Sequence, residues 1–255
     1  MSVIFGYDSL QDGGATVTSS NTATTYPVDN AVDWLPFDFF QPDAAAASVT
    51  IKFSSASALT ADYLAIQGHD LFTLGARVKV EYSSDDISYS TALGATTVPD
   101  DGVFFRSFTS QSAKYWLVTI DRVDAATIQP FISLLLVGEA LDMSKAPQQS
   151  YSPHLLDEDT GKTSVSLTGN WLGKSIIKTG GDLSMNFGNL TETFVRDSWV
   201  PFVSHTQSKV FIVSWDETNY PNESHLAWID KNKPTYKYTT NRWMEVSINM
   251  KVRNI

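Results

Sequence analysis

The sequence predicts an all-β protein, and three observations support that fold class. Residues 77–82 alternate apolar and polar side chains with a period of two, as a strand with one buried face does. Similar segments recur at intervals of about 8–12 residues, a spacing typical of a β-sandwich or jelly roll. Turn-forming residues, such as those at 99–102, separate these segments. We therefore expect short antiparallel strands joined by tight connections.

Residues 1–140 contain about eight predicted strands and no amphipathic helix. Val49, Ile51 and Phe53 alternate on one face of one strand, so that face is expected to be buried. Residues 91–102 are predicted to form a polar loop. The predicted strands cover residues 1–14 (an arm or edge strand), 15–26, 44–53, 63–66, 77–82, 103–108, 113–120 and 128–137.

The second part of the sequence is also predicted to be β-rich, with at most one short helix. Residues 190–199 are the best helix candidate, and Pro201 is expected to end that helix. Residues 243–253 alternate cleanly and place one apolar face together, formed by Met244, Val246, Ile248, Met250 and Val252. The other predicted strands are residues 164–167, 176–179, 183–187 and 209–215.

Changes in composition divide the chain into four predicted parts. An N-terminal arm covers residues 1–14, and a β-sandwich covers residues 15–140. Residues 141–164 contain prolines, paired glutamines and an acidic cluster, which are typical of a linker. Residues 165–255 form the predicted β-rich domain, to which we assign oligomerisation.

Composition excludes several classes of function. Residues 1–146 hold 7 Lys+Arg against 17 Asp+Glu, so this part carries the whole net charge of −10 and disfavours nucleic acid as a partner. The chain has no cysteine, which excludes disulfides and thiolate metal sites. The longest predominantly apolar stretch, residues 131–137 with Ser133 within it, is too short to span a membrane. The N-terminus lacks a secretory signal pattern, so we expect assembly in a cytoplasm.

The sequence offers no catalytic constellation. Its four histidines, His69, His154, His205 and His225, are isolated, and no metalloprotease, nucleophile-elbow or phosphate-loop pattern occurs. The histidine at the glycine-containing corner is expected to bond backbone groups there. We therefore predict a protein that is not an enzyme, with no catalytic residues, no metal site and no required cofactor.

One loop concentrates polar groups beside a large aromatic ring. Asp29, Asn30 and Asp33 precede Trp34 within six residues. Their oxygens suit a hard cation such as calcium, whereas a tryptophan beside polar groups suits stacking on a sugar. In the third alternative the polar residues form local turns and the tryptophan closes the end of the sandwich. All three alternatives stay open on the sequence alone.

Five of the seven tryptophans lie in the C-terminal part. Some are expected in its core, but tryptophan is also enriched at subunit interfaces. The balanced charge of residues 147–255, with 11 Lys+Arg and 11 Asp+Glu, would not oppose self-association. The candidate interface residues are Trp171, Trp199, Trp215, Trp228 and Trp243.

Three motifs resemble the discoidin or galactose-binding-like jelly roll over residues 13–140. They are Asn30-Ala31-Val32-Asp33 in a loop, residues 80–85 with the pattern Val-x-Tyr-Ser-x-Asp, and the strand at residues 114–120. The resemblance implies a jelly-roll sandwich and a loop that contacts sugars. The family's terminal disulfide cannot exist here, and Tyr89 stands where the family has tryptophan.

The corner at residues 66–71 and the C-terminal part look like tail proteins of bacteriophages, in particular distal-tail or tail-tip proteins. This resemblance implies a non-enzymatic virion protein that joins the tail tube to receptor-binding parts through an oligomeric ring. Its implied partners are other copies, as a trimer or hexamer, other tail proteins and a host-surface glycan. The alternative function is a stand-alone carbohydrate-binding module, which would bind glycans as a monomer.

Overall fold

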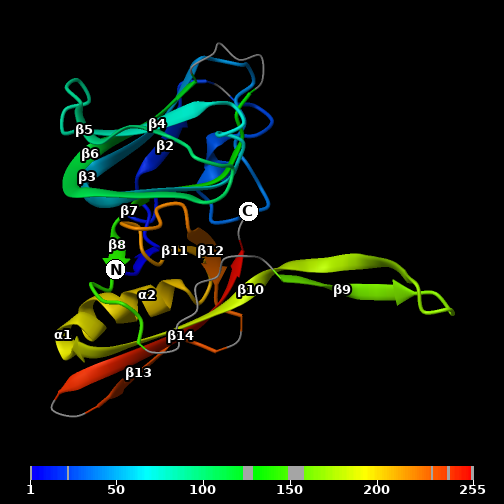
Figure 1. Cartoon of the computed structure of the whole chain (residues 1–255). Helices are drawn as coiled ribbons and strands as arrows, with labels where there is room; N and C mark the ends of the chain where they lie inside the picture. The colour runs from blue at the N-terminus through cyan, green and yellow to red at the C-terminus, as the bar shows by residue number, and fades with distance from the viewer. Residues whose placement is uncertain are drawn as a thin grey trace.

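Two antiparallel β-sheets account for most of the chain, as the computed structural model in Figure 1 shows. The structure describes residues 2–21, 23–122, 129–148, 158–230, 232–239 and 242–253. One sheet forms a sandwich, and the other carries a helix on one face and a long hairpin at one edge. The predicted fold class, a jelly-roll-type sandwich followed by a β-rich part with one short helix, is confirmed.

The sandwich is a six-stranded sheet in the order β2-β3-β6-β4-β5, with β7 beside β3. Two very long strands bend so that the sheet folds over its own core. The bend in β3 lies between Ser54 and Leu59, where its register with β6 shifts. The strands are β2 (Thr16–Ser19), β3 (Ser48–His69), β4 (Ala76–Ser83), β5 (Ser90–Thr97), β6 (Phe104–Arg122) and β7 (Ile132–Gly138).

Two expectations for the sandwich were wrong in detail. The polar segment predicted as a loop at residues 91–102 contains β5, which is exposed but pairs along β4. Its ladder hydrogen bonds, rather than apolar side chains, make it a strand. Segments 44–53 and 63–66 are two halves of β3, and 103–108 and 113–120 are two halves of β6, because each strand continues through its bend.

The second sheet joins the two ends of the sequence. Strand β1 (Ile4–Gly6), from the predicted arm, lies between β8 (Ala140–Asp142) and β11 (Phe211–Ser214). The order is β8-β1-β11-β12-β14-β10-β9, with β13 beside β14. The other strands are β9 (Glu158–Val165), β10 (Trp171–Thr191), β12 (Ser224–Trp228), β13 (Thr235–Tyr238) and β14 (Trp243–Arg253). The predicted strand at residues 243–253 is therefore confirmed.

A helical segment follows β10 without a break. It consists of α1 (Glu192–Phe194), a π-helical turn η2 (Val195–Trp199) and α2 (Val200–His205). The prediction that Pro201 ends the helix is wrong, because this proline occupies the first turn of α2. The preceding π-helical turn changes the hydrogen-bond spacing where a proline would otherwise break an α-helix.

Three apolar cores hold these layers together. The first fills the folded sandwich and includes Trp116 and Phe53. The second lies between the helix and the second sheet, where Phe5 packs edge-on against Trp199 at 6.4 Å. The third lies between the sandwich and the second sheet, and Tyr63 is one of its members. The two sheets are therefore joined by a continuous apolar interface.

All seven residues of β7 are buried, because both faces of this strand are covered. Leu135 and Val137 point into the sandwich core, whereas Leu134 and Leu136 point into the core between the sheets. Gly138, at the end of β7, packs closely against the backbone of Asp8. Apart from Ser133, residues 131–137 are all apolar, and a predominantly apolar stretch is typical of a strand buried on both faces.

Gly138 allows this close approach, and Gly138→Ala tests it. A Cβ atom at this position would lie 2.3 Å from the carbonyl oxygen of Asp8, so the backbone must shift. We expect a loss of about 2–3 kcal/mol in the free energy of unfolding, measured by urea denaturation. Gly94→Ala is the matched control, because no atom of the described residues lies within 4 Å of its new Cβ. Equal losses in the two variants would contradict this explanation.

Candidate functional site

The predicted polar loop is a short 3-10 helix, η1 (Val28–Ala31), followed by turns. The side chain of Asn30 donates hydrogen bonds to Asp38 Oδ1 and to the carbonyl of Phe39, each at 3.1 Å. The Oδ1 of Asp33 accepts from the backbone N–H of Leu35 at 2.8 Å. Asp29 is exposed. The amide and one carboxylate are thus used to hold the loop in shape.

Trp34 lies apart from these polar groups. Its side chain is only 8% exposed, and its indole N–H donates to Asp12 Oδ1 at 3.3 Å. His205 packs edge-on against the indole at 4.7 Å between ring centroids, and Lys209 Nζ lies 4.9 Å over the ring. Both partners come from the second half of the sequence. The contacts of this tryptophan therefore join the two halves of the molecule.

Other aromatic side chains of the same loop are accessible. Tyr26 and Phe39 stack with their ring centroids 4.3 Å apart. Phe37 is 79% exposed, and Leu35 is also exposed. The sequence analysis named Trp34, the largest ring of the loop, as the sugar contact and did not name Phe37. Trp34 is buried by residues from the second half of the sequence, whereas Phe37 is exposed to solvent. No local sequence pattern shows this difference.

The five candidate interface tryptophans separate into two groups. Trp199 is fully buried, and Trp215 is buried with its indole N–H donating to Glu223 Oε2 at 2.9 Å. Trp228 is half-buried. Trp171 and Trp243 are exposed, at opposite ends of β10 and β14. Surface exposure therefore leaves two of the five tryptophans well placed to contact a partner.

Trp171 belongs to a hairpin that stands clear of the molecule. We call residues 158–180 of β9 and β10 the arm. Among the described residues, its two strands pair only with each other, and β10 begins to pair with β14 at Gly181 (Figure 1). The strands are joined by a turn in which Gly169 has a φ of +83°. The exposed apolar side chains of the arm are Val165, Leu167, Trp171, Leu172 and Ile176.

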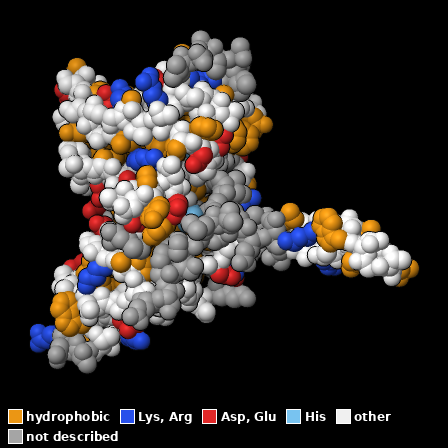
Figure 2. Space-filling view, in the orientation of Figure 1, with side chains coloured by type: hydrophobic (Ala, Val, Ile, Leu, Met, Phe, Trp, Pro, Cys, Tyr) orange, Lys and Arg blue, Asp and Glu red, His pale blue; other side chains and the backbone are white. Residues whose placement is uncertain are grey.

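The arm differs in charge from the rest of the chain. Residues 161–176 contain Lys162 and Lys174 and no acidic residue, whereas the whole chain has a net charge of −10. The acidic residues of the arm, Glu158 and Asp159, lie at its base. Figure 2 shows hydrophobic and basic side chains along the arm. The outer arm is therefore an apolar and basic ribbon.

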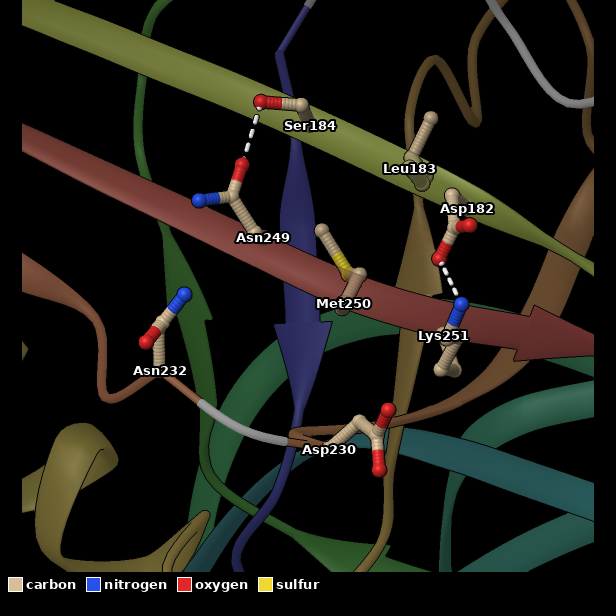
Figure 3. Close-up of a pocket in the computed structure, with 8 residues that line it drawn as sticks. All are labelled: Asp182, Leu183, Ser184, Asp230, Asn232, Asn249, Met250 and Lys251. Atoms are coloured by element: carbon tan, nitrogen blue, oxygen red, sulfur yellow. Dashed lines mark hydrogen bonds and ion pairs between the residues drawn. The ribbon is translucent and has the colours of Figure 1, made fainter.

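A polar cavity of about 350 Å³ lies near the base of the arm (Figure 3). Ser184 donates to Asn249 Oδ1 at 2.6 Å, and Lys251 forms an ion pair with Asp182. These pairs occupy the face of β10 and β14 opposite to the core side chains Leu183 and Met250. The cavity is lined by Asp182, Leu183, Ser184, Asp230, Asn232, Asn249, Met250 and Lys251. Lys251 is paired with Asp182, and Asp230 adds a second carboxylate to the lining.

A second, smaller cavity of about 220 Å³ lies where the sandwich meets β8, and we call it the junction groove. Its lining combines apolar and acidic side chains: Ile4, Asp62, Ser107, Phe108, Ala140 and Asp142. Burial, together with the nearby charges of Glu139 and Asp142, raises the pKa of Asp62 to about 6. Burial also raises the pKa of Asp8 to about 6, with Glu139 again contributing. The groove therefore has an electrostatically crowded acidic rim.

The predicted absence of catalysis and of metals remains a prediction. Within the described residues, no group of three His, Asp or Glu side chains could hold a metal ion. His69 Nδ1 accepts from the backbone N–H of Leu71 at 3.3 Å, and burial lowers its pKa. His154 lies outside the described residues. No helix in the described part of the chain is long and apolar enough to cross a membrane.

The raised pKa of Asp62 predicts a specific pH dependence of stability. Its folded-state pKa of about 6 exceeds the ordinary value of 3.8, so its contribution to stability is lost as the pH rises from about 4 to 6. Asp62→Asn removes this penalty and keeps an oxygen that accepts from the N–H of Ala140. After allowance for solvent exposure, we expect a gain of about 1 kcal/mol at pH 7 and little at pH 4.

Urea denaturation followed by tryptophan fluorescence at pH 4, 5, 6 and 7 measures this difference. Asp197→Asn, at an exposed position on the helical segment whose charge is not among those acting on Asp62, is the control for a general loss of surface charge. If Asp62→Asn raised the free energy of unfolding equally at every pH, the ionised carboxylate of Asp62 would not be the cause of the lost stability.

Comparison with known proteins gives partial likenesses only. The sequence matches no protein-family profile, and no curated protein is significantly similar to it. Solved structures similar to about half of the chain include a GH29 fucosidase from Ruminococcus gnavus in complex with fucose, at 18% identity and a TM-score of 0.45, covering 52% of this chain and 27% of the fucosidase.

Two smaller proteins give similar values. Chitosan-binding module 1 of a chitosanase/glucanase from Paenibacillus sp. IK-5 is 18% identical, with 48% of this chain and 93% of the module covered and a TM-score of 0.41. CpGH89CBM32-5 from Clostridium perfringens, in complex with GalNAc-β-1,3-galactose, is 10% identical, with 51% and 99% covered and a TM-score of 0.43. At these identities and TM-scores, the likenesses do not identify what this chain binds.

Proposed function

We propose that this protein is a non-catalytic assembly subunit that associates with further copies of itself through the arm. The arm is the observation that carries the proposal. Trp171 is 70% exposed there, and four further apolar side chains on the same ribbon also lie in solvent. A concentration of exposed apolar side chains on one projecting element often marks an interaction site.

The two strands of the outer arm have no third strand or packed layer to stabilise them within the described part of the chain. An isolated two-stranded hairpin is marginally stable in water, and three or more strands or a packing partner are normally needed. The base of the arm is held firmly, because Leu183, Met185 and Phe187 of β10 are buried in the core beneath the helix. A neighbouring protein that covers the outer arm would supply the missing packing. Tryptophan is a frequent source of binding energy at such contacts.

A second copy is the occupant that the charge distribution favours. The outer arm is basic, and the remainder of the chain is strongly acidic. The more specific role, a tail-tip component of a long-tailed phage that joins the tail tube to receptor-binding parts in a virion, rests on the sequence resemblance alone. So do a trimeric or hexameric ring and contacts with other tail proteins.

Light scattering on a sizing column tests this function. The purified chain is expected to have a mass several times its 28.1 kDa, and Trp171→Ser with Leu172→Ser is expected to reduce it to the monomer mass. Loss of one exposed tryptophan anchor typically costs about 2 kcal/mol or more of binding free energy. Ile87→Ser, at a position 84% exposed on the sandwich, is the control. A monomer at every concentration would contradict the proposal.

Glycan binding by the sandwich is the second candidate function. It is favoured by the exposed Phe37 and the stacked Tyr26 and Phe39, because aromatic faces beside polar groups suit the apolar faces of sugars. Asp29 lies in the same loop and could accept hydrogen bonds from sugar hydroxyls. In this second candidate function, the sugar contacts the exposed side chains of the loop rather than the buried Trp34. It is compatible with assembly through the arm.

A glycan array with two variants separates a sugar contact from a structural one. Phe37→Ala is expected to abolish binding and to leave the free energy of unfolding within about 0.5 kcal/mol. Trp34→Ala is expected to lower that free energy by about 3 kcal/mol, because its buried indole joins the two halves. Glycan binding that survives Phe37→Ala would exclude this surface, and a stable Trp34→Ala would contradict its structural role.

A further inference from the structure

The arm and the junction groove lie at opposite edges of the same sheet. Strand β9 ends the sheet on one side and β8 ends it on the other, with five strands between them. The arm extends β9 and β10 outward, whereas Ala140 and Asp142 of β8 line the groove. Figure 1 shows β8 and the arm on opposite sides of the molecule. An arm cannot reach the groove of its own chain in this arrangement.

The two surfaces are complementary in charge. The outer arm carries Lys162 and Lys174 without an acidic residue. The groove carries Asp62 and Asp142, and Glu139 is close enough to raise the pKa of Asp62. Figure 2 shows acidic side chains at the waist of the molecule, on the side away from the arm. A lysine brought to this crowded acidic rim would relieve the repulsion among its carboxylates.

They are also complementary in shape and polarity. The groove is a concavity with apolar groups from Ile4, Phe108 and Ala140 and acidic groups at its rim. The arm is a narrow two-stranded ribbon with exposed apolar side chains on both strands and at its turn. From Gly180 at its base to Trp171, β10 extends about 30 Å. This reach is enough to cross from one copy onto the next.

We propose that the outer arm of one copy docks in the junction groove of the next copy, an inference that rests on the proposed assembly function. Apolar side chains of the arm cover Ile4 and Phe108, and Lys162 approaches the acidic rim. Because donor and acceptor are different surfaces, the contact is head-to-tail. Such contacts close into a ring when the rotation between copies permits it and otherwise continue as a filament.

A charge exchange tests the pairing. Lys162→Glu is expected to raise the dissociation constant between copies about three- to tenfold, by replacing attraction with repulsion at the rim. Glu139→Lys is expected to have a similar effect, and the double variant to recover most of the affinity. Lys114→Glu, an exposed lysine on the sandwich, is the matched control. Sedimentation over a range of protein and salt concentrations measures the constants.

Cysteine cross-linking tests the position directly, because the natural chain has no cysteine. Val165→Cys, Leu167→Cys and Leu172→Cys are each mixed with Ser107→Cys, an exposed position in the groove, and with Ile87→Cys as the control. After mild oxidation, disulfide-linked dimers are expected with Ser107→Cys and not with Ile87→Cys.

The outcomes separate the two proposals. An unmodified chain that is monomeric overturns both assembly and docking. An oligomer in which Lys162→Glu and Lys114→Glu behave alike, and in which no arm cysteine links preferentially to Ser107→Cys, overturns docking in the groove and leaves assembly standing. Loss of affinity in each single charge variant, recovery in the double variant and selective cross-linking together support the docking.

Discussion

The architecture depends on one layer of strands whose two faces are both buried. The second half of β3, the first half of β6 and the whole of β7 close the sandwich with one face and cover the second sheet with the other. Tyr63 and Phe105 stack on that outer face with their ring centroids 5.6 Å apart. If the second sheet were removed, these rings would be exposed. The sandwich and the second sheet therefore stabilise one another, as layers around a shared core usually do.

The fold class was predictable because the period of apolar residues is a strong local signal. The alternation in residues 243–253 identified both the strand and its buried face, and the apolar stretch that ends at Val137 identified a strand, although not the burial of both its faces. The strand ends were less predictable. The bends of β3 and β6 depend on register shifts between strands distant in sequence, and β5 owes its conformation to pairing with β4 rather than to its own composition. Pairing between strands that are distant in sequence cannot be recognised from a short segment of the sequence.

The candidate sites were less predictable than the fold, for a related reason. A tryptophan beside carboxylates is equally compatible with a sugar contact and with burial, and the distant partners Asp12, His205 and Lys209 decide where Trp34 lies. Likewise, five tryptophans in one half could not be divided into core and surface without the sheet. The arm was the most serious omission, since its strands were predicted as separate short pieces partly assigned to a linker. The turn at Gly169 was its clearest local signal.

The arm and the core share a single strand, and this has a mechanical consequence. Strand β10 runs without interruption from Trp171, through the arm, into the ladder that it forms with β14 from Gly181 to Thr191. A pull along the arm would therefore load these hydrogen bonds in shear, all at the same time, rather than opening them one after another. Geometry of this kind resists tension well. A partner holding the arm would be coupled through the backbone itself to the apolar core beneath the helix.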